Sequence, residues 1–127
     1  MSFTTIVGNA ILNGYLKGTT IAVPTDFDIS LHTGDPGQDG SNEVAAGAYT
    51  YVRKEPSFGA VAAKSATTDA VMTWEDMPAV TVSHVGYWGY FTDTWVFLWG
   101  NALAASKVVA AEATFELPIG DCDFDLT

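Results

Sequence analysis

Cysteine, basic residues and long apolar runs are all scarce in this chain of 127 residues. The single cysteine, Cys122, excludes an intrachain disulfide. No apolar run approaches the ~20 residues that a membrane-spanning helix needs, and the first residues lack the basic and apolar regions of a signal peptide. We therefore expect a protein that is made in the cytoplasm and does not enter a membrane.

Positive charge is scarce relative to negative charge. Five Lys and Arg stand against fifteen Asp and Glu, which gives a formal net charge of −10. A surface of this sign repels phosphate backbones, so direct binding to nucleic acid is not expected. Because no basic residue follows Lys107, the C-terminal end should carry negative potential.

Familiar catalytic motifs are missing as well. The chain has no G-x-S-x-G elbow, no P-loop, no G-x-G-x-x-G and no H-E-x-x-H. Its two histidines and one cysteine are too few and too distant for a convincing zinc site. We expect His84, among valines and glycines, to be a core histidine bound to backbone groups, and His32 to brace the loop that follows it. The prediction is a protein without enzymatic activity and without a cofactor.

Apolar and aromatic residues are plentiful by contrast. The hydrophobic fraction is 48% and the aromatic fraction 13%, whereas only 16% of residues are charged. The length predicts a single domain over residues 1–127, with enough apolar material for a real core. Low charge with many aromatics also suggests surface that is buried against a partner.

The first residues predict a helix. Between Ser2 and about Tyr15 the apolar residues follow the i, i+3, i+4 spacing of one helical face, with Ser2 or Thr4 as N-cap and Gly18 as terminator. Residues 1–18 are therefore expected to form an N-terminal helix or arm. Gly8 and Gly14 weaken it, so tertiary packing must hold it in place.

The remaining residues, 19–127, predict an antiparallel β-sandwich, jelly-roll-like, built from about eight short strands. The strongest signal is a hairpin of Val80–Phe91 and Thr94–Trp99, with the turn at Thr92–Asp93. On its second strand we expect Trp95, Phe97 and Trp99 to share one face. The other expected strands are Thr19–Val23, Phe27–His32, Ala48–Lys54, Ala70–Trp74, Lys107–Ala110, Ala113–Leu117 and Asp121–Leu126, with Asn101–Ser106 as a connection. Strand Phe27–His32 should be half-buried, with Ser30 and His32 on its polar face.

The most distinctive stretch is the loop from Leu31 to Val44. Its Gly, Pro, Asp and Asn residues are typical of tight turns that side chains tie to their own backbone. A weak calcium-binding alternative rests on Asp35, Asp39 and Glu43, which can be laid on an EF-hand loop. That pattern fails at Ala46, where the bidentate glutamate should stand.

Two carbohydrate-related alternatives remain open. Carboxylates such as Glu75 and Asp76, or Asp121, Asp123 and Asp125, could act as the acid and base of a glycosidase. A sugar-binding platform could instead be built from exposed indoles, with Trp88, Trp95 and Trp99 as candidates. In both cases the ordinary structural role, a solvated strand face or a buried aromatic, is the simpler interpretation.

The order of these motifs resembles a family of small tailed-bacteriophage virion proteins, the head decoration and tail fibre-like proteins. In that family an N-terminal helix precedes a strand ending in L-H-T-x-D-P-G and then G-x-N-E-V, similar to Leu31–Gly37 and Gly40–Val44 here. A later T-V-T-H-V-G-x-W run is similar to Thr81–Trp88, and a G-x-L turn to Trp99–Leu103. The region Ser57–Pro78 departs from the family pattern.

The resemblance implies a structural protein of the virion, made in the cytoplasm of the bacterial host. Its leading form is a capsid decoration subunit that binds and stabilises the outer surface of the head; the alternative is a tail-tip or tail fibre-associated subunit that contacts the host. The implied partners are the major capsid protein or tail proteins, together with further copies of the chain in a homo-oligomer such as a trimer. The residues expected in the structural loop and at an interface are Leu31, His32, Thr33, Asp35, Pro36, Asn42, Glu43, His84 and Trp88.

Overall fold

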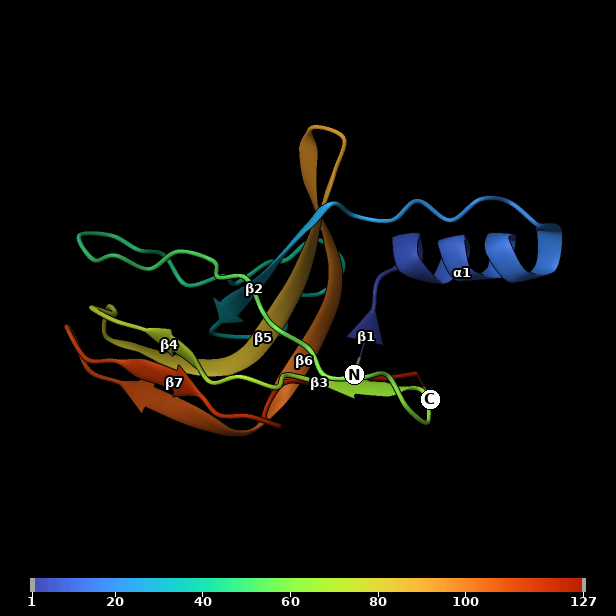
Figure 1. The fold of residues 1–127 in the computed structure, drawn as a ribbon. Coiled ribbons are helices and arrows are strands. Elements are labelled where there is room, and N and C mark those ends of the chain that lie inside the picture. Colours follow the sequence, from blue (N-terminus) through green and yellow to red (C-terminus); the bar gives the residue numbers. More distant parts are fainter. Residues whose placement is uncertain (1, 127) are drawn as a thin grey trace.

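The computed structural model describes residues 2–126, which form one helix and eight strands in antiparallel sheets (Figure 1). The elements are β1 (Ser2–Phe3), α1 (Thr5–Lys17), β2 (Asp26–His32), β3 (Ser65–Thr67), β4 (Met72–Trp74), β5 (Val80–Phe91), β6 (Thr94–Val109), β7 (Phe115–Leu117) and β8 (Asp123–Asp125). The predicted class, a mostly β antiparallel fold with one short N-terminal helix, is confirmed.

A four-stranded sheet in the order β1-β6-β5-β2 forms the larger layer. Two small sheets, β3-β8 and β4-β7, supply the other layer. The buried core joins Ile29, Leu31 and Val85 of the large sheet to Trp74 and Leu117 of the β4-β7 pair. The two layers therefore bury one face of the large sheet between them, as expected of a sandwich-like arrangement.

The β5-β6 hairpin is present as predicted, with Thr92 at a positive φ of 57° in its turn. The expected connection at Asn101–Ser106 is wrong, because β6 continues to Val109 and includes it. The strand absorbs these residues in a bulge: Val82 pairs with Lys107 and His84 with Ala102, so residues 103–106 lie opposite Ser83.

A second bulge changes which way the aromatic side chains of β6 point. Tyr87 pairs with Trp99 and Trp88 with Phe97, which leaves Leu98 as the extra residue. Tyr87 and Trp88 are neighbours on β5 and point to opposite faces, and each ring contacts its partner on β6, at 6.1 Å and 5.1 Å between centroids. Phe97 and Trp99 therefore lie on opposite faces, and the prediction that they share one is wrong.

Two predicted strands are not strands in the structure. Thr19–Val23 has no strand pairing; it runs back beside the helix, and Ile21 packs so closely on Gly14 that a Cβ there would lie 2.5 Å away. Ala48–Lys54 contributes a single bridge, between Ile29 and Lys54. The apolar residues of both segments pack individually rather than in a ladder, which a sequence pattern cannot distinguish. Of the remaining predicted strands, Phe27–His32 is present as β2 and is one residue longer, and Lys107–Ala110 forms no separate strand because residues 107–109 are the end of β6. The other three are present with narrower bounds, as β4, β7 and β8.

The predicted helix is present as α1, two residues longer at its C-terminal end than expected. Thr4 is its N-cap, although the Thr4 hydroxyl makes no capping bond; the Thr5 N–H is instead bound by Gln38 Oε1 at 2.8 Å. Gly18 ends the helix in the left-handed conformation, at φ 70°. Within residues 2–126, no helix is long and apolar enough to cross a membrane.

Candidate functional site

The loop of residues 33–44 lies against one face of the large sheet and is tied internally by its turn residues. Asp35 Oδ1 accepts the Gly37 N–H at 2.9 Å, and Asn42 Nδ2 donates to the Asp35 carbonyl at 2.9 Å. Pro36 is buried beside Gly100, where a Cβ would lie only 2.6 Å from the proline ring. The turn chemistry predicted for this loop is therefore the chemistry that shapes it.

A chain of hydrogen bonds joins the loop to the sheet. Trp88 Nε1 donates to Ser30 Oγ at 2.8 Å, Ser30 Oγ lies 2.6 Å from His32 Nε2, and His32 Nδ1 lies 2.7 Å from the Ser41 carbonyl. A carbonyl only accepts, so the proton of neutral His32 is on Nδ1, and Nε2 accepts from the serine hydroxyl. Burial lowers the pKa of His32, which favours this neutral form. His32 braces the loop, as expected.

The burial of Ser30 and His32 contradicts the prediction that they form a polar, solvated face of β2. Both are fully buried. The space for them comes from Gly86 on the paired strand, where a Cβ would lie 2.6 Å from both Ser30 Oγ and His32 Nε2. The missing side chain at Gly86, together with the overlying loop, makes this a buried polar layer rather than a surface.

Glu43 and Arg53 close a second connection over the same face. The guanidinium makes three contacts with the carboxylate at 2.9, 3.0 and 3.3 Å, and its carbon lies 3.6 Å from the centre of the Trp88 ring. Tyr51 donates its hydroxyl to Glu43 Oε2 at 2.8 Å and accepts the Leu31 N–H at 2.9 Å. Burial raises the pKa of the Tyr51 phenol, so the hydroxyl keeps the proton that it donates.

The three weak calcium candidates, Asp35, Asp39 and Glu43, all bind groups of the protein itself. Asp35 and Asp39 bind backbone and hydroxyl groups of their own turns, and Glu43 is engaged by Arg53 and Tyr51. The described part of the chain holds no cluster of three or more His, Cys, Asp or Glu side chains placed to bind a metal ion. The three carboxylates act in the scaffold instead.

Three other predicted site residues, Leu31, Thr33 and His84, differ in how far they are buried. Leu31 is a fully buried core residue, and Thr33 is exposed, with its hydroxyl 3.3 Å from the Asn42 carbonyl. The prediction that His84 is a core histidine bound to backbone groups is wrong: it is half-buried, and its Nδ1 lies 2.8 Å from the Ser83 hydroxyl. The bulge at Ser83 brings that hydroxyl beside the ring.

The three candidate indoles of a sugar platform do not share a face. Trp88 lies under Arg53 on the loop side of the sheet, whereas Trp99 lies on the opposite side with Tyr87. Trp95 packs against Tyr90 near the hairpin turn in a tilted arrangement, at 5.2 Å between ring centroids. The structure therefore places Trp99 on the other side of the sheet from Trp88.

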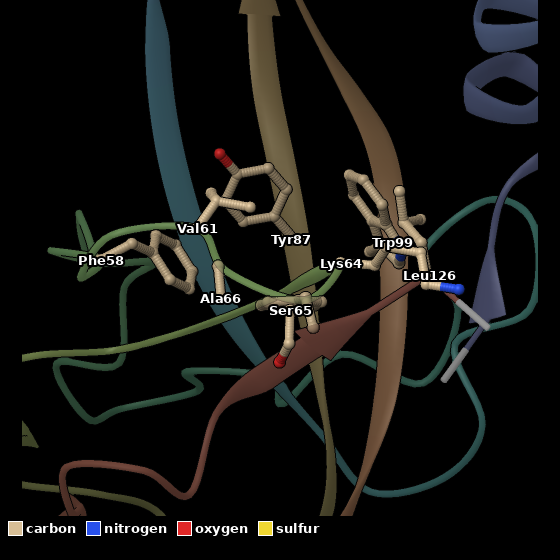
Figure 2. Close-up of a pocket in the computed structure, with 9 residues that line it drawn as sticks. Phe58, Val61, Lys64, Ser65, Ala66, Tyr87, Trp99 and Leu126 are labelled. Atoms are coloured by element: carbon tan, nitrogen blue, oxygen red, sulfur yellow. The ribbon is translucent and has the colours of Figure 1, made fainter.

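Two apolar hollows lie on the face opposite the loop. The first, of about 320 Å³, is the C-terminal hollow, whose walls include Phe58, Val61, Tyr87, Trp99, Phe124 and Leu126 (Figure 2). Burial raises the pKa of Tyr87 to about 12. The buried Trp99 Nε1 has no hydrogen-bond partner among the described residues. An almost wholly apolar lining suits an apolar side chain better than a polyhydroxylated sugar.

The second hollow, of about 450 Å³, separates α1 from the large sheet, and we call it the helix hollow. Its walls include Ile6, Val7, Ala10 and Ile11 on the helix and Phe27 and Leu98 on the sheet. No α1 residue is buried, and Figure 1 shows the helix lying to one side of the strands. The two glycines of the helix predicted that tertiary packing must hold it in place, but the described residues supply little of that packing, since no α1 residue is buried.

Charge is distributed unevenly along the chain. Before Asp26 the only charged side chain is Lys17. The formal charge of −10 is therefore the sum of +1 from Lys17 and −11 from residues 26–127. The helix and the segment that returns beside it therefore form an N-terminal module, residues 2–25, that has no acidic side chain. The absence of acidic residues from this module is visible in the sequence.

The chain is similar to a known protein family over almost all of its length. A family model described as podophage GP4 fiber I protein gp80 matches residues 2–125. No curated protein matches the chain at a significant level. The matched range includes the N-terminal module, both layers of the sandwich and the loop over the sheet.

Proposed function

Because the chain belongs to this family of podophage fibre proteins, we propose that it is a non-enzymatic structural subunit of a phage fibre. The observation that carries the proposal is the extent of the family match, which spans residues 2–125 rather than one motif. Membership agrees with the resemblance to phage virion proteins. The part of that resemblance that rests on the L-H-T-x-D-P-G motif stays a prediction.

The geometry supports a role in assembly more than a role in chemistry. Two polar side chains that were candidates for a site are engaged inside the protein: His32 binds Ser30 and the Ser41 carbonyl, and Glu43 binds Arg53. These contacts fasten the loop to the sheet. Large apolar side chains are left in contact with water on the outside of α1, and apolar side chains also line the two hollows. Apolar patches of this kind are typical of contacts between proteins.

The proposed partners are other tail proteins of the virion and further copies of the chain. An acidic body with a net charge of −11 over residues 26–127 opposes contact with DNA, so the proposal includes no nucleic acid. We expect the protein to be made in the host cytoplasm and to enter the virion during assembly.

The family description favours the tail-fibre hypothesis. Capsid decoration was the leading expectation from the sequence and is now the alternative. The two differ in where the protein lies. A fibre subunit lies on the tail and its loss lowers adsorption to host cells; a decoration subunit covers the head and its loss weakens the shell.

Labelled virions distinguish these locations. An epitope tag can be inserted at the exposed hairpin tip, Thr92–Asp93, which lies at the far end of the two strands (Figure 1); neither residue lines a hollow. We expect antibody-gold particles at the tail, and virions that lack the protein should keep stable heads but adsorb poorly. A tag inserted elsewhere on the acidic body, at the exposed Gly120 turn, controls for masking of one epitope. Gold on the head with both tags would refute the fibre proposal.

A further inference from the structure

The outer face of α1 presents a continuous apolar ridge. Leu12, Tyr15 and Leu16 lie at i, i+3 and i+4, so their side chains share one face of the helix. They are 56, 82 and 77% exposed. The ridge therefore consists of three large apolar side chains that the described part of the chain leaves in water.

The helix has little else to keep it folded. It spans 13 residues and includes Gly8 and Gly14, and isolated helices of this length are marginal in water. On its inner side the helix hollow of about 450 Å³ takes the place of the close packing found in protein interiors. Support for the helix must therefore come from its outer side as well.

Charge indicates what covers the ridge. A partner recognised by charge would need a charged surface on the module, and the module offers only Lys17. Two copies of the chain repel through residues 26–127, which carry −11 each, but not through the module. The module is thus the part through which two copies can meet while their acidic bodies stay apart.

We propose that two copies of this chain associate through α1, the ridge of Leu12, Tyr15 and Leu16 on one copy packing against the same ridge on the other. An apolar ridge without charge is self-complementary, as a contact between identical surfaces about a two-fold axis requires. Packing of helix against helix brings the axes to about 8–10 Å and removes these side chains from water. This inference goes beyond the fibre proposal because it concerns the purified protein alone.

Sedimentation equilibrium of the full chain tests the contact, over concentrations from about 1 μM to 1 mM, where contacts of modest size dissociate. We expect wild-type protein to form dimers as concentration rises. Leu16→Lys and Leu12→Lys should each raise the dissociation constant at least about tenfold, because they place a charge in an apolar contact. Far-ultraviolet circular dichroism should show less helix in the variants and in dilute wild type.

Val108→Lys is the matched control. Val108 is 85% exposed on β6, far in sequence from the ridge, so it receives the same charge on a different apolar surface. Adding lysine reduces the net negative charge and weakens general repulsion, so loss of dimers in the ridge variants cannot come from repulsion between the bodies. Near-ultraviolet circular dichroism verifies that each variant keeps its folded β core.

Three outcomes would overturn the inference: wild type that stays monomeric throughout, ridge variants that dimerise like wild type, or a Val108→Lys variant that loses dimers equally. A monomer in solution would leave the fibre proposal standing, since that depends on the location of the protein in the virion. Gold on the head would refute the fibre proposal and leave the contact through α1 in place.

Discussion

The pair formed by Glu43 and Arg53 should couple strongly, because it links the loop to the sheet in a partly dry setting. We consider Arg53→Gln, Glu43→Gln and the double variant. The pair makes three contacts of 2.9 to 3.3 Å, and its side chains are only 28 and 22% exposed. Hydrogen bonds between charged groups contribute about 1.5–3 kcal/mol when buried, and partial exposure reduces this, so we expect a coupling free energy of about 1–2 kcal/mol.

Arg53→Gln should lose more than this coupling. It also removes the guanidinium from the face of Trp88, 3.6 Å from the ring centre, a contact worth about 1 kcal/mol. The single variant should therefore lose about 2–3 kcal/mol of unfolding free energy. Urea unfolding followed by tryptophan fluorescence, with circular dichroism as a second probe, measures each variant and the coupling between the two substitutions.

A second ion pair in the same chain provides the comparison. Lys107 Nζ lies 3.4 Å from Asp121 Oδ2, in a single contact between side chains that are 38 and 44% exposed. Exposed pairs of this kind contribute less than about 0.5–1 kcal/mol. If the cycle at Glu43 and Arg53 yields no more coupling than the cycle at Lys107 and Asp121, the contacts over the sheet do not stabilise the loop as described.

Three further predictions concern single side chains. Burial lowers the pKa of His32, so below about pH 6.5 the unfolded chain binds a proton that the folded chain resists. Stability is therefore complete above that pH and falls as pH drops; His32→Gln should flatten this dependence between about pH 7.5 and 5.5, and an unchanged slope would contradict the assignment. Gly86→Ala places a Cβ 2.6 Å from Ser30 Oγ and should cost about 2 kcal/mol or more in urea unfolding. Gly59→Ala, whose nearest neighbours lie 3.8 Å away, should change stability by less than about 0.5 kcal/mol. Burial, with a smaller effect of neighbouring aspartates, raises the pKa of Cys122 to about 12, so the thiol should resist disulfide reagents until the chain unfolds; rapid labelling of folded protein would contradict this prediction.

Much of the local structure follows from the sequence. The β5-β6 hairpin, the N-terminal helix with Gly18 as its end, and the tight turns of the loop were all predictable, because each depends on residues close together in the chain. Aromatic and β-branched residues favour extended backbone, and glycine at the end of a helix accepts the left-handed conformation.

The faces of the strands were harder to predict. Strict alternation put Phe97 and Trp99 on one side of β6, and the bulge at Leu98 separated them. A bulge depends on which residue of the neighbouring strand lies opposite, so no pattern within β6 alone reveals it. The same limit applied at Ser30 and His32, which alternation assigned to solvent and which the paired Gly86 and the overlying loop bury.

By itself, the sequence determined the class of fold, the turn chemistry of the loop and the strong acidity that leaves only the N-terminal module without negative charge. These depend on composition and on neighbours along the chain. Only the tertiary structure decided that His32, Glu43 and Arg53 bind within the protein, and that Leu12, Tyr15 and Leu16 remain in water. Both outcomes depend on which distant segments cover a side chain, and coverage is set by strand register and by the path of the chain between elements.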